Sequence, residues 1–294
     1  MQSVPYDEFE KYLGKPRPCL ICDTDPDGSD REVWAKDNYF NAIKCQTCNL
    51  ITIDPGLTEE GLQIYYQDNM GRRLDQQKKL DDRMEQYNID NQILERYINS
   101  GKVLDVGCGG GFFLSVLNNN FDKYGIDIDS ESINHGKKNF NFTFKCELIG
   151  DDSFDKGYFD LIIFRGVIEH MYNPKKALSR ASELLKTGGL LYFCATPNVD
   201  SFCADLYREK WNLWHPIQHI NHFSSETLYS LCGKDNYEIF HESYPYLGTP
   251  YESQKNDYLK LKSDIKLINE GRREDVTVSP PFWGNMLSLI LKKV

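Results

Sequence analysis

Residues 103–112 read VLDVGCGGGF, a short run typical of a buried strand that leads directly into a glycine cluster. An apolar segment with helical spacing follows, so the stretch predicts a parallel strand, a tight turn and a helix start. Glycines in such a turn let the backbone approach a ligand where a Cβ would collide. Residues 125–128, GIDI, predict a second short strand, in which Asp127 supplies a carboxylate. A carboxylate beside a glycine-rich first turn is placed to bind the two hydroxyls of a ribose, which indicates an adenosine-type cofactor.

The glycine spacing separates two kinds of cofactor. A dinucleotide site uses G-x-G-x-x-G around a pyrophosphate, but the third fingerprint position here is Phe112. Asp105, at the strand end, would repel a pyrophosphate and suits an ammonium group. We therefore expect a cofactor with a ribose and an amino-acid head but no phosphate. Gly107, Gly109 and Gly111 are its expected contacts in the turn.

These two motifs resemble those of the class I S-adenosylmethionine-dependent methyltransferases. The resemblance continues through a predicted strand at 158–164, a helix at 174–186 closed by two glycines, and a strand at 190–197. It implies a Rossmann-like α/β sheet of seven strands whose last pair is antiparallel. It also implies S-adenosylmethionine as the cofactor.

Other side chains are candidates for cofactor contacts. Asp127 is expected at the ribose, with Ile128 beside it. The resemblance implies that the turn after the third strand reads the adenine amine. Glu147, Asp151 and Asp152 remain alternatives for that contact.

The predicted strand at 158–164 is followed by Arg165 and by the pair Glu169-His170. Arg165 is a candidate partner for the carboxylate of the cofactor or for a carboxylate or phosphate of the substrate; a surface arginine is the alternative. A similar Glu-His pair in quinone-type O-methyltransferases helps to hold magnesium, together with an acidic residue three positions earlier. That position is Gly166 here, so we expect backbone support from His170 rather than a metal-assisted mechanism.

Two C-x-x-C knuckles lie near the start of the chain, formed by Cys19 with Cys22 and by Cys45 with Cys48. The two-residue spacing lets both thiolates of a knuckle reach one tetrahedral zinc ion. Disulfide bonds are not expected, because no segment directs the chain to secretion. Four thiolates leave no open position for water, so the sequence predicts a structural zinc ribbon.

These motifs divide the chain into three parts. Residues 1–54 form the predicted zinc-ribbon module, and residues 55–101 form a helical linker and cofactor lid. Residues 102–294 form the predicted methyltransferase domain, with a helical insertion near 254–270.

Three histidines, His215, His219 and His222, crowd into the segment after the strand at 190–197. Loops at the carboxyl ends of parallel strands line the ligand crevice. A hydroxyl acceptor needs a base, and histidine suits that role near neutral pH. We expect His219 to be the base, with His222 as second choice, because similar H-x-x-H-F segments occur in deoxysugar methyltransferases that carry an N-terminal zinc module. The alternative is that these histidines only bond to the loop backbone before a helix capped by Ser224.

The composition limits the kinds of partner and ligand that we expect the protein to bind. The net charge of −10 has the wrong sign for a protein that binds a nucleic-acid backbone. Tyr and Phe dominate the aromatic residues, which suits a pocket for polar rings such as sugars. No apolar run is long enough to cross a membrane and no secretion leader is apparent, so we expect a cytoplasmic protein without membrane insertion.

Together these features predict methyl transfer to a small molecule or sugar, most directly to a hydroxyl of a nucleotide-linked sugar or surface glycan. O-methylation is favoured over C-methylation, because the related sugar C-methyltransferases continue into a third large domain and this chain stops at Val294. Two alternatives remain open: an RNA methyltransferase with a zinc-ribbon recognition module, and a non-catalytic partner protein that keeps the cofactor fold. The sequence does not indicate an oligomeric state.

Overall fold

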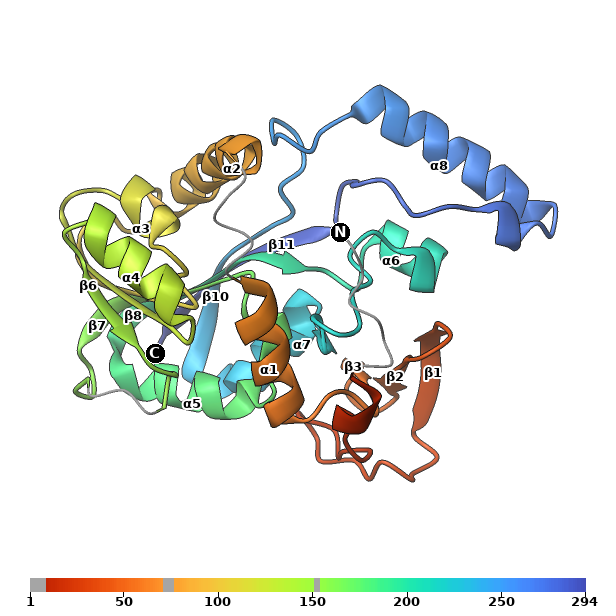
Figure 1. The fold of residues 1–294 in the computed structure, drawn as a ribbon, viewed down its shortest axis with the longest axis horizontal. Coiled ribbons are helices and arrows are strands. Elements are labelled where there is room, and N and C mark those ends of the chain that lie inside the picture. The colour runs from red at the N-terminus through yellow and green to blue at the C-terminus, as the bar shows by residue number, and fades with distance from the viewer. Residues whose placement is uncertain (1–8, 71–76, 151–153) are drawn as a thin grey trace.

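The computed structural model describes residues 9–70, 77–150 and 154–294, and its centre is a seven-stranded sheet (Figure 1). The strand order is β10-β11-β8-β7-β4-β5-β6. β11 runs antiparallel to both β8 and β10, and the other neighbours are parallel. This confirms the predicted Rossmann-like sheet with an antiparallel last pair. The strands are β4 (Gly101–Val106), β5 (Phe121–Asp127), β6 (Thr143–Cys146), β7 (Phe159–Arg165), β8 (Leu185–Pro197), β10 (Tyr237–Ser243) and β11 (Met286–Lys293).

Helices cover both faces of this sheet (Figure 1). Successive residues of a strand point to opposite faces, so Leu104 and Val106 of β4 pack with α5 (Pro174–Leu184) and α7 (Ser225–Cys232). Val103 packs on the other face with three further helices. These are α2 (Gln77–Leu94), α3 (Phe112–Val116) and α4 (Ser130–Asn139). Burial on both faces explains the continuous apolar runs in the strand sequences.

The predicted helix at 174–186 is two residues too long. α5 ends at Leu184, and Leu185 pairs with Phe159 of β7 as the first residue of β8. Gly188 therefore lies within β8, at φ 78°, and does not cap the helix.

A smaller sheet, in the order β1-β2-β3-β9, stands beside the main one (Figure 1). Its first three strands belong to the N-terminal module and are β1 (Arg31–Lys36), β2 (Asn41–Cys45) and β3 (Ile51–Ile53). The fourth, β9 (Asn221–His222), comes from the segment that holds the clustered histidines. The N-terminal module and the histidine segment therefore share one sheet.

Two more helices follow strands of the two sheets along the chain. α1 (Glu59–Met70) follows the N-terminal module, and the short α6 (Phe202–Tyr207) follows β8. None of the helices in the described ranges is long and apolar enough to cross a membrane.

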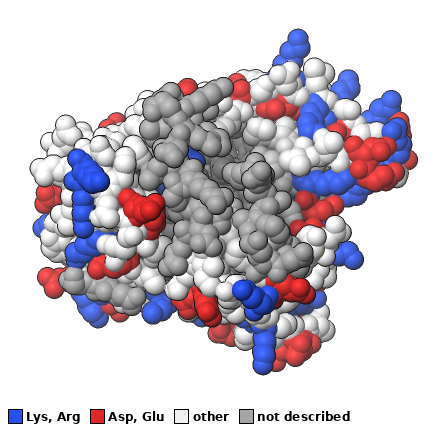
Figure 2. Space-filling model, in the orientation of Figure 1, with Lys and Arg blue, Asp and Glu red and all other residues white. Residues whose placement is uncertain are grey.

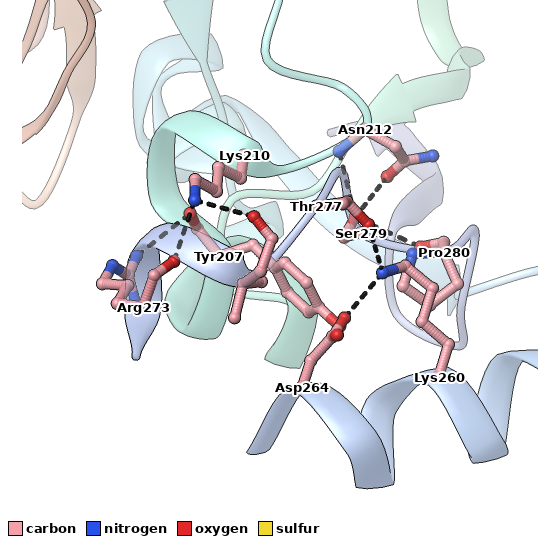
Figure 3. Close-up of polar contacts among 10 residues, drawn as sticks. Tyr207, Lys210, Asn212, Lys260, Asp264, Arg273, Thr277, Ser279 and Pro280 are labelled. Atoms are coloured by element: carbon pink, nitrogen blue, oxygen red, sulfur yellow. Dashed lines mark hydrogen bonds and ion pairs between the residues drawn. The ribbon is translucent and has the colours of Figure 1, made fainter. Parts of the chain in front are cut away.

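The predicted insertion near 254–270 corresponds to α8 (Gln254–Asn269), which projects from the body of the molecule (Figure 1). Polar contacts hold its inner side (Figure 3). The Tyr207 hydroxyl donates to Asp264 at 2.6 Å. Lys260 donates to Asp264 at 2.7 Å and to the Thr277 hydroxyl at 2.9 Å. α8 is thus fixed to α6 through buried polar groups.

Candidate active site

A cavity of about 2120 Å³ opens at the carboxyl ends of β4, β5, β7 and β8. Ligand sites occur at this edge of open α/β sheets. The volume exceeds the roughly 300–1,000 Å³ typical of a site for one small ligand, so a cofactor and an acceptor both fit. We call the part lined by residues within 105–113, 126–132 and 147–149 the glycine side. We call the part lined by residues within 37–40, 59–66, 169–172, 212–219, 245–251 and 281–287 the histidine side.

The glycines of the first turn have different roles. All three predicted contacts have positive φ: 72° at Gly107, 52° at Gly109 and 80° at Gly111. A Cβ on Gly109 would meet nothing within 4 Å and would project into the cavity, as expected where a ligand approaches the backbone. A Cβ on Gly111 would lie 2.5 Å from the Phe144 ring, and Gly111 does not line the cavity. Gly111 is therefore needed for helix–strand packing, and its contact with the cofactor stays a prediction.

Two carboxylates flank this turn on the glycine side. Asp127 accepts the Gly109 N–H at 2.8 Å and the Asp129 N–H at 2.8 Å, which fixes its orientation at the cavity wall. Asp105 is fully buried, its Oδ1 has no hydrogen-bond partner, and burial raises its pKa to about 8. An orphaned carboxyl next to an open glycine turn fits the ammonium end of an amino-acid cofactor.

The remaining predicted cofactor residues also lie at the cavity. Ile128 lines it and is exposed, and Glu147 lines it beyond the end of β6. The alternatives to Glu147, namely Asp151 and Asp152, lie outside the described residues. Glu147 and Ile128 therefore stay predictions for the adenine end.

Arg165 has a partner that the sequence did not reveal. Its guanidinium pairs with Asp90 of α2 at 2.8 Å and lies over the Tyr87 ring at 4.2 Å. Although burial opposes the charge, Asp90 raises the pKa of Arg165 above its ordinary value. Arg165 lines the cavity, but its charge is already neutralised by Asp90, so the predicted pairing with a ligand carboxylate or phosphate is not needed to compensate it.

His219 lies on the histidine side, close to His170, with ring centroids 4.9 Å apart. The Nδ1 of His219 is 2.8 Å from the Leu213 carbonyl, and the Nδ1 of His170 is 2.8 Å from the Gln218 carbonyl. A carbonyl oxygen only accepts, so Nδ1 carries the proton in both rings and Nε2 is the basic nitrogen. Burial, followed by the proximity of His170, lowers the pKa of His219 well below 6.5.

His222 occupies a different environment. It is fully buried, does not line the cavity, and stacks on Trp214 with a centroid distance of 5.6 Å and an interplanar angle of 4°. Trp211 and Trp34 lie close on other sides, and neither ring nitrogen of His222 has a hydrogen-bond partner. Burial lowers its pKa to about 3. These contacts favour a packing role for His222, whose part as the second-choice base stays a prediction.

Glu169 faces the two histidines of the cavity. Its Oε1 is 3.8 Å from Nε2 of His170, and its Oε2 is buried without a hydrogen-bond partner. Burial raises the pKa of Glu169 to about 8. One ligand atom each from Glu169, His170 and His219 lie within 4.8 Å of one another, so the three could hold a divalent cation. The sequence predicted only backbone support at this pair, because Gly166 stands where a third, acidic ligand was expected. The structure instead brings His219 to the pair from a loop that is remote in the chain.

The segment after α8 supplies part of the histidine side of the cavity. Figure 3 shows its contact with Asn212. The Asn212 N–H donates to the Ser279 hydroxyl at 3.0 Å, and the Asn285 side-chain amide donates to Asn212 Oδ1 at 3.0 Å. Asn212 and Asn285 both line the cavity. The segment from 279 to 285 is therefore fixed against the start of the loop at 213–222, which we call the histidine loop.

The four predicted zinc ligands lie together in the N-terminal module. Their sulfur atoms lie within 4.8 Å of one another, with Cys19 and Cys48 at 3.3 Å and Cys22 and Cys45 at 3.5 Å. Each knuckle is followed by a residue in the left-handed region, at φ 57° after Cys22 and φ 64° after Cys48. All four thiols are free of disulfides. Four convergent thiols in two matching turns fit a tetrahedral zinc ion.

Comparison with known proteins agrees with this geometry. The methyltransferase-domain family matches residues 84–242, more than half of the chain. A ubiquinone biosynthesis O-methyltransferase of Coxiella burnetii is 30% identical over 123 residues, which is 38% of this chain and 53% of that protein. An uncharacterized protein of Methanocaldococcus jannaschii is 31% identical over 125 residues, 42% of this chain and 58% of that protein. The chain thus spans little more than half the length of these curated relatives.

Solved structures share the fold at low identity. An S-adenosylmethionine-dependent methyltransferase of Thermotoga maritima, described as a possible histamine N-methyltransferase, has a TM-score of 0.52 and 16% identity; the match covers 79% of this chain and 98% of that one. A complex of the Haloferax volcanii Trm112 methyltransferase activator with a putative methyltransferase has a TM-score of 0.55 and 14% identity, covering 79% and 96%. With its matching sheet, cofactor turn and family assignment, the chain belongs to the S-adenosylmethionine-dependent class I methyltransferases.

Proposed function

We propose that this protein methylates a hydroxyl of a small polar acceptor, and that the acceptor is a nucleotide-linked sugar or a surface glycan. The observation that carries the proposal is that His219 lines the same cavity as the glycine turn, while its Nδ1 is bonded to the Leu213 carbonyl and Nε2 is left as its basic nitrogen. A hydroxyl is too weak a nucleophile to react without losing its proton as the bond to carbon forms, so the acceptor needs such a base.

The glycine side would hold the cofactor. S-adenosylmethionine, when bound, supplies an activated methyl group for in-line displacement. Asp127 is fixed by two backbone N–H groups and would bind the ribose diol, while the buried Asp105 would face the ammonium group. The open space at Gly109 leaves room for the chain of the cofactor between them. The contribution of these residues is alignment, since the reacting carbon is already activated.

His219 would take the proton of the acceptor hydroxyl. Its lowered pKa keeps the ring neutral at physiological pH, so the basic Nε2 is available at all times. The Leu213 carbonyl holds the ring in one tautomer throughout.

The histidine side supports a ring-shaped polar acceptor. Its wall combines aromatic faces with polar side chains, as sites for sugars and other polar rings do. The aromatic residues are Tyr39, Phe40, Tyr65, Tyr66, Tyr172, Trp214, Tyr246, Tyr251 and Phe282. The O-methyltransferase among the relatives favours oxygen over carbon as the acceptor atom.

The charge distribution favours a small acceptor over RNA. Acidic and basic side chains are interspersed over the described part of the face in Figure 2, including α8. The net charge of −10 adds a repulsive contribution for a polyanion.

Methyl transfer from labelled cofactor tests the proposal. The purified protein would be incubated with nucleotide sugars, glycans and RNA fractions, and the labelled product would be analysed by mass spectrometry and NMR. We expect label in a nucleotide-sugar or glycan fraction, as an O-methyl ether. Label in RNA alone, a C-methyl product, or no transfer to any fraction despite measurable cofactor binding would overturn it.

A further inference from the structure

The N-terminal module is joined to the histidine loop by backbone pairing. In β3, Ile51 is opposite His222 and Thr52 is opposite Asn221. One residue earlier in the loop, the Ile220 carbonyl accepts the Ile53 N–H at 2.9 Å. This contact begins at the residue that directly follows His219, so the position of His219 depends on the register of β3.

A second connection reaches the turn that carries Glu169 and His170. The guanidinium of Arg17, which precedes the first knuckle, donates to the Tyr172 carbonyl at 3.1 Å and lies over the Tyr172 ring at 4.3 Å. Arg17 is itself fixed within the module, because its carbonyl accepts from Arg31 at 2.7 Å and its N–H donates to Asp54 at 3.2 Å. Arg31 and Asp54 form an ion pair at 2.7 Å with both side chains buried.

A third connection joins the turn at 168–172 to the loop at 213–222. The side-chain amide of Asn221, in β9, donates to the Met171 carbonyl at 2.8 Å, and Asn221 is fully buried. Met171 directly follows His170. Neither Asn221 nor Arg17 lines the cavity, so both act on it only through other residues.

From these three connections we propose that the cysteine module is the platform that positions the acceptor-side histidines, and that Arg17 and Asn221 are its positioning residues. The proposal deepens the proposed function, because it rests on His219 and His170 forming the acceptor-side chemistry. The module holds the turn at 168–172 through Arg17 and the loop at 213–222 through β3. Asn221 then fixes the distance between the two segments, and with it the separation of the two rings.

The physical reason is the steep dependence of proton transfer on distance. A base must lie within about 2.6–3.2 Å of the proton it removes. A displacement of about 1 Å can lower the rate on the order of 100-fold. Two loops without a shared support would not keep two rings at one spacing. A sheet strand and a stacked arginine supply that support without occupying the cavity.

Two variants test the proposal: Arg17→Met, which keeps the side-chain stem but loses the donor, and Asn221→Ala. Arg180→Met is the matched control, because Arg180 also donates to a backbone carbonyl, that of Phe154 at 2.8 Å, but lies on α5. For each protein we would measure kcat and KM for the acceptor, cofactor affinity by calorimetry, zinc content, melting temperature and long-range ¹H–¹⁵N spectra of the histidine rings.

We expect Arg17→Met and Asn221→Ala to lower kcat about 10- to 100-fold while cofactor affinity stays within about twofold and zinc is retained. Their ring spectra should show altered signals for His170 and His219, and Arg17→Lys should restore part of both effects. Arg180→Met should change neither.

The proposal is wrong if the Arg17→Met protein is folded and its ring signals and kcat match those of the wild type, or if its melting temperature falls with no change in either. Should Asn221→Ala fail to fold, Arg17→Met and Arg17→Lys decide the outcome. The ring spectra need no acceptor, so they test the platform even if the proposed methylation of a hydroxyl proves wrong.

Discussion

The two sides of the cavity are built in opposite ways. The glycine side comes mainly from consecutive strand–turn units, and its main fixing contact, Gly109 to Asp127, joins neighbouring strands. The histidine side is assembled from the N-terminal module, α1, the loops after β7 and β8 and the segment after α8. A site held by local turns tolerates changes elsewhere in the chain, whereas a site made of distant segments depends on every contact that holds them together.

The two sides also differ in the ligand that each is expected to bind. All class I methyltransferases present the same cofactor, so a local and self-contained glycine side serves any of them. The acceptor differs, and the histidine side here includes residues from a module outside the matched family region of 84–242. If the two sides are separate units, a change on one side should leave the other unaffected.

Replacing His219 by Ala should have the largest effect. Loss of a positioned base costs about 10²- to 10⁴-fold in rate, so kcat should fall by that factor. Cofactor affinity should stay within about twofold, because His219 lies on the histidine side and does not touch the glycine turn. Transfer of labelled methyl at saturating cofactor, with calorimetry in parallel, measures both. Unchanged turnover would remove His219 as the base, and a large loss of affinity would show that the two sides are coupled.

Two glycines of one turn should separate binding from stability. Ala at Gly111 places a Cβ 2.5 Å from the Phe144 ring at φ 80°, so strain and overpacking together should lower the free energy of unfolding by about 2–5 kcal/mol. Ala at Gly109 meets no atom within 4 Å, so only the cost of its φ of 52°, about 1–2 kcal/mol, remains. Gly109→Ala should instead weaken cofactor binding about 10-fold, since its Cβ enters the cavity. Urea unfolding and calorimetry measure the two effects, and the reverse pattern would contradict the placement of the turn.

The sequence predicts the glycine side better than the histidine side for a physical reason. Strand, turn and helix in residues 103–112 each have a local signature, and the family resemblance that rests on it implies the seven-stranded sheet that the structure shows. The glycine spacing gives Gly107, Gly109 and Gly111 the same predicted role, because spacing alone does not tell ligand contact from packing. The packing at Gly111 depends on Phe144 of another strand.

Long-range contacts decided the remaining differences. The pair of Arg165 with Asp90 joins residues 75 positions apart, and the polar residue Asp90 carries no sign of it in the helical pattern. β9 has only two residues, too few for any periodicity, yet it turns His222 into the tryptophan cluster and away from the cavity. The sequence could show that histidines gather after β8, but not which of them faces the ligand.

Binding of the cofactor should release a proton from the glycine side. Burial raises the pKa of Asp105 to about 8, so at pH 7 its carboxyl is mostly protonated in the free protein. A nearby ammonium group lowers that pKa, so binding expels the proton and affinity should rise on the order of 10-fold between pH 6 and 7.5. Calorimetry in buffers of different ionisation enthalpy counts the proton.

The matched control for this release lies on the histidine side. Burial also raises the pKa of Glu169 to about 8, but Glu169 faces His170 and not the glycine turn. Asp105→Asn should abolish proton release, and Glu169→Gln should leave it unchanged. The opposite result would place the ammonium group on the histidine side.

Lys210→Met should have the smallest effect and should act on the histidine side alone. The Lys210 amine donates to the carbonyls of Arg273, Glu274 and Val276 at 2.8, 3.1 and 2.7 Å, which fixes the start of the segment that runs to the cavity (Figure 3). Leaving these carbonyls without their donor should cost about 1–3 kcal/mol of stability and raise the acceptor KM severalfold, with cofactor affinity unchanged.

Lys266→Met controls for the loss of one positive charge, because the pair that Lys266 makes with Glu270 at 3.7 Å is exposed and worth less than about 1 kcal/mol. If Lys210→Met lowers cofactor affinity as much as it raises the acceptor KM, the segment after α8 supports both sides of the cavity. The glycine side would then also depend on a distant segment, and the two sides would not be separate units. If only the acceptor KM rises, the segment from 273 to 287 supports the histidine side alone.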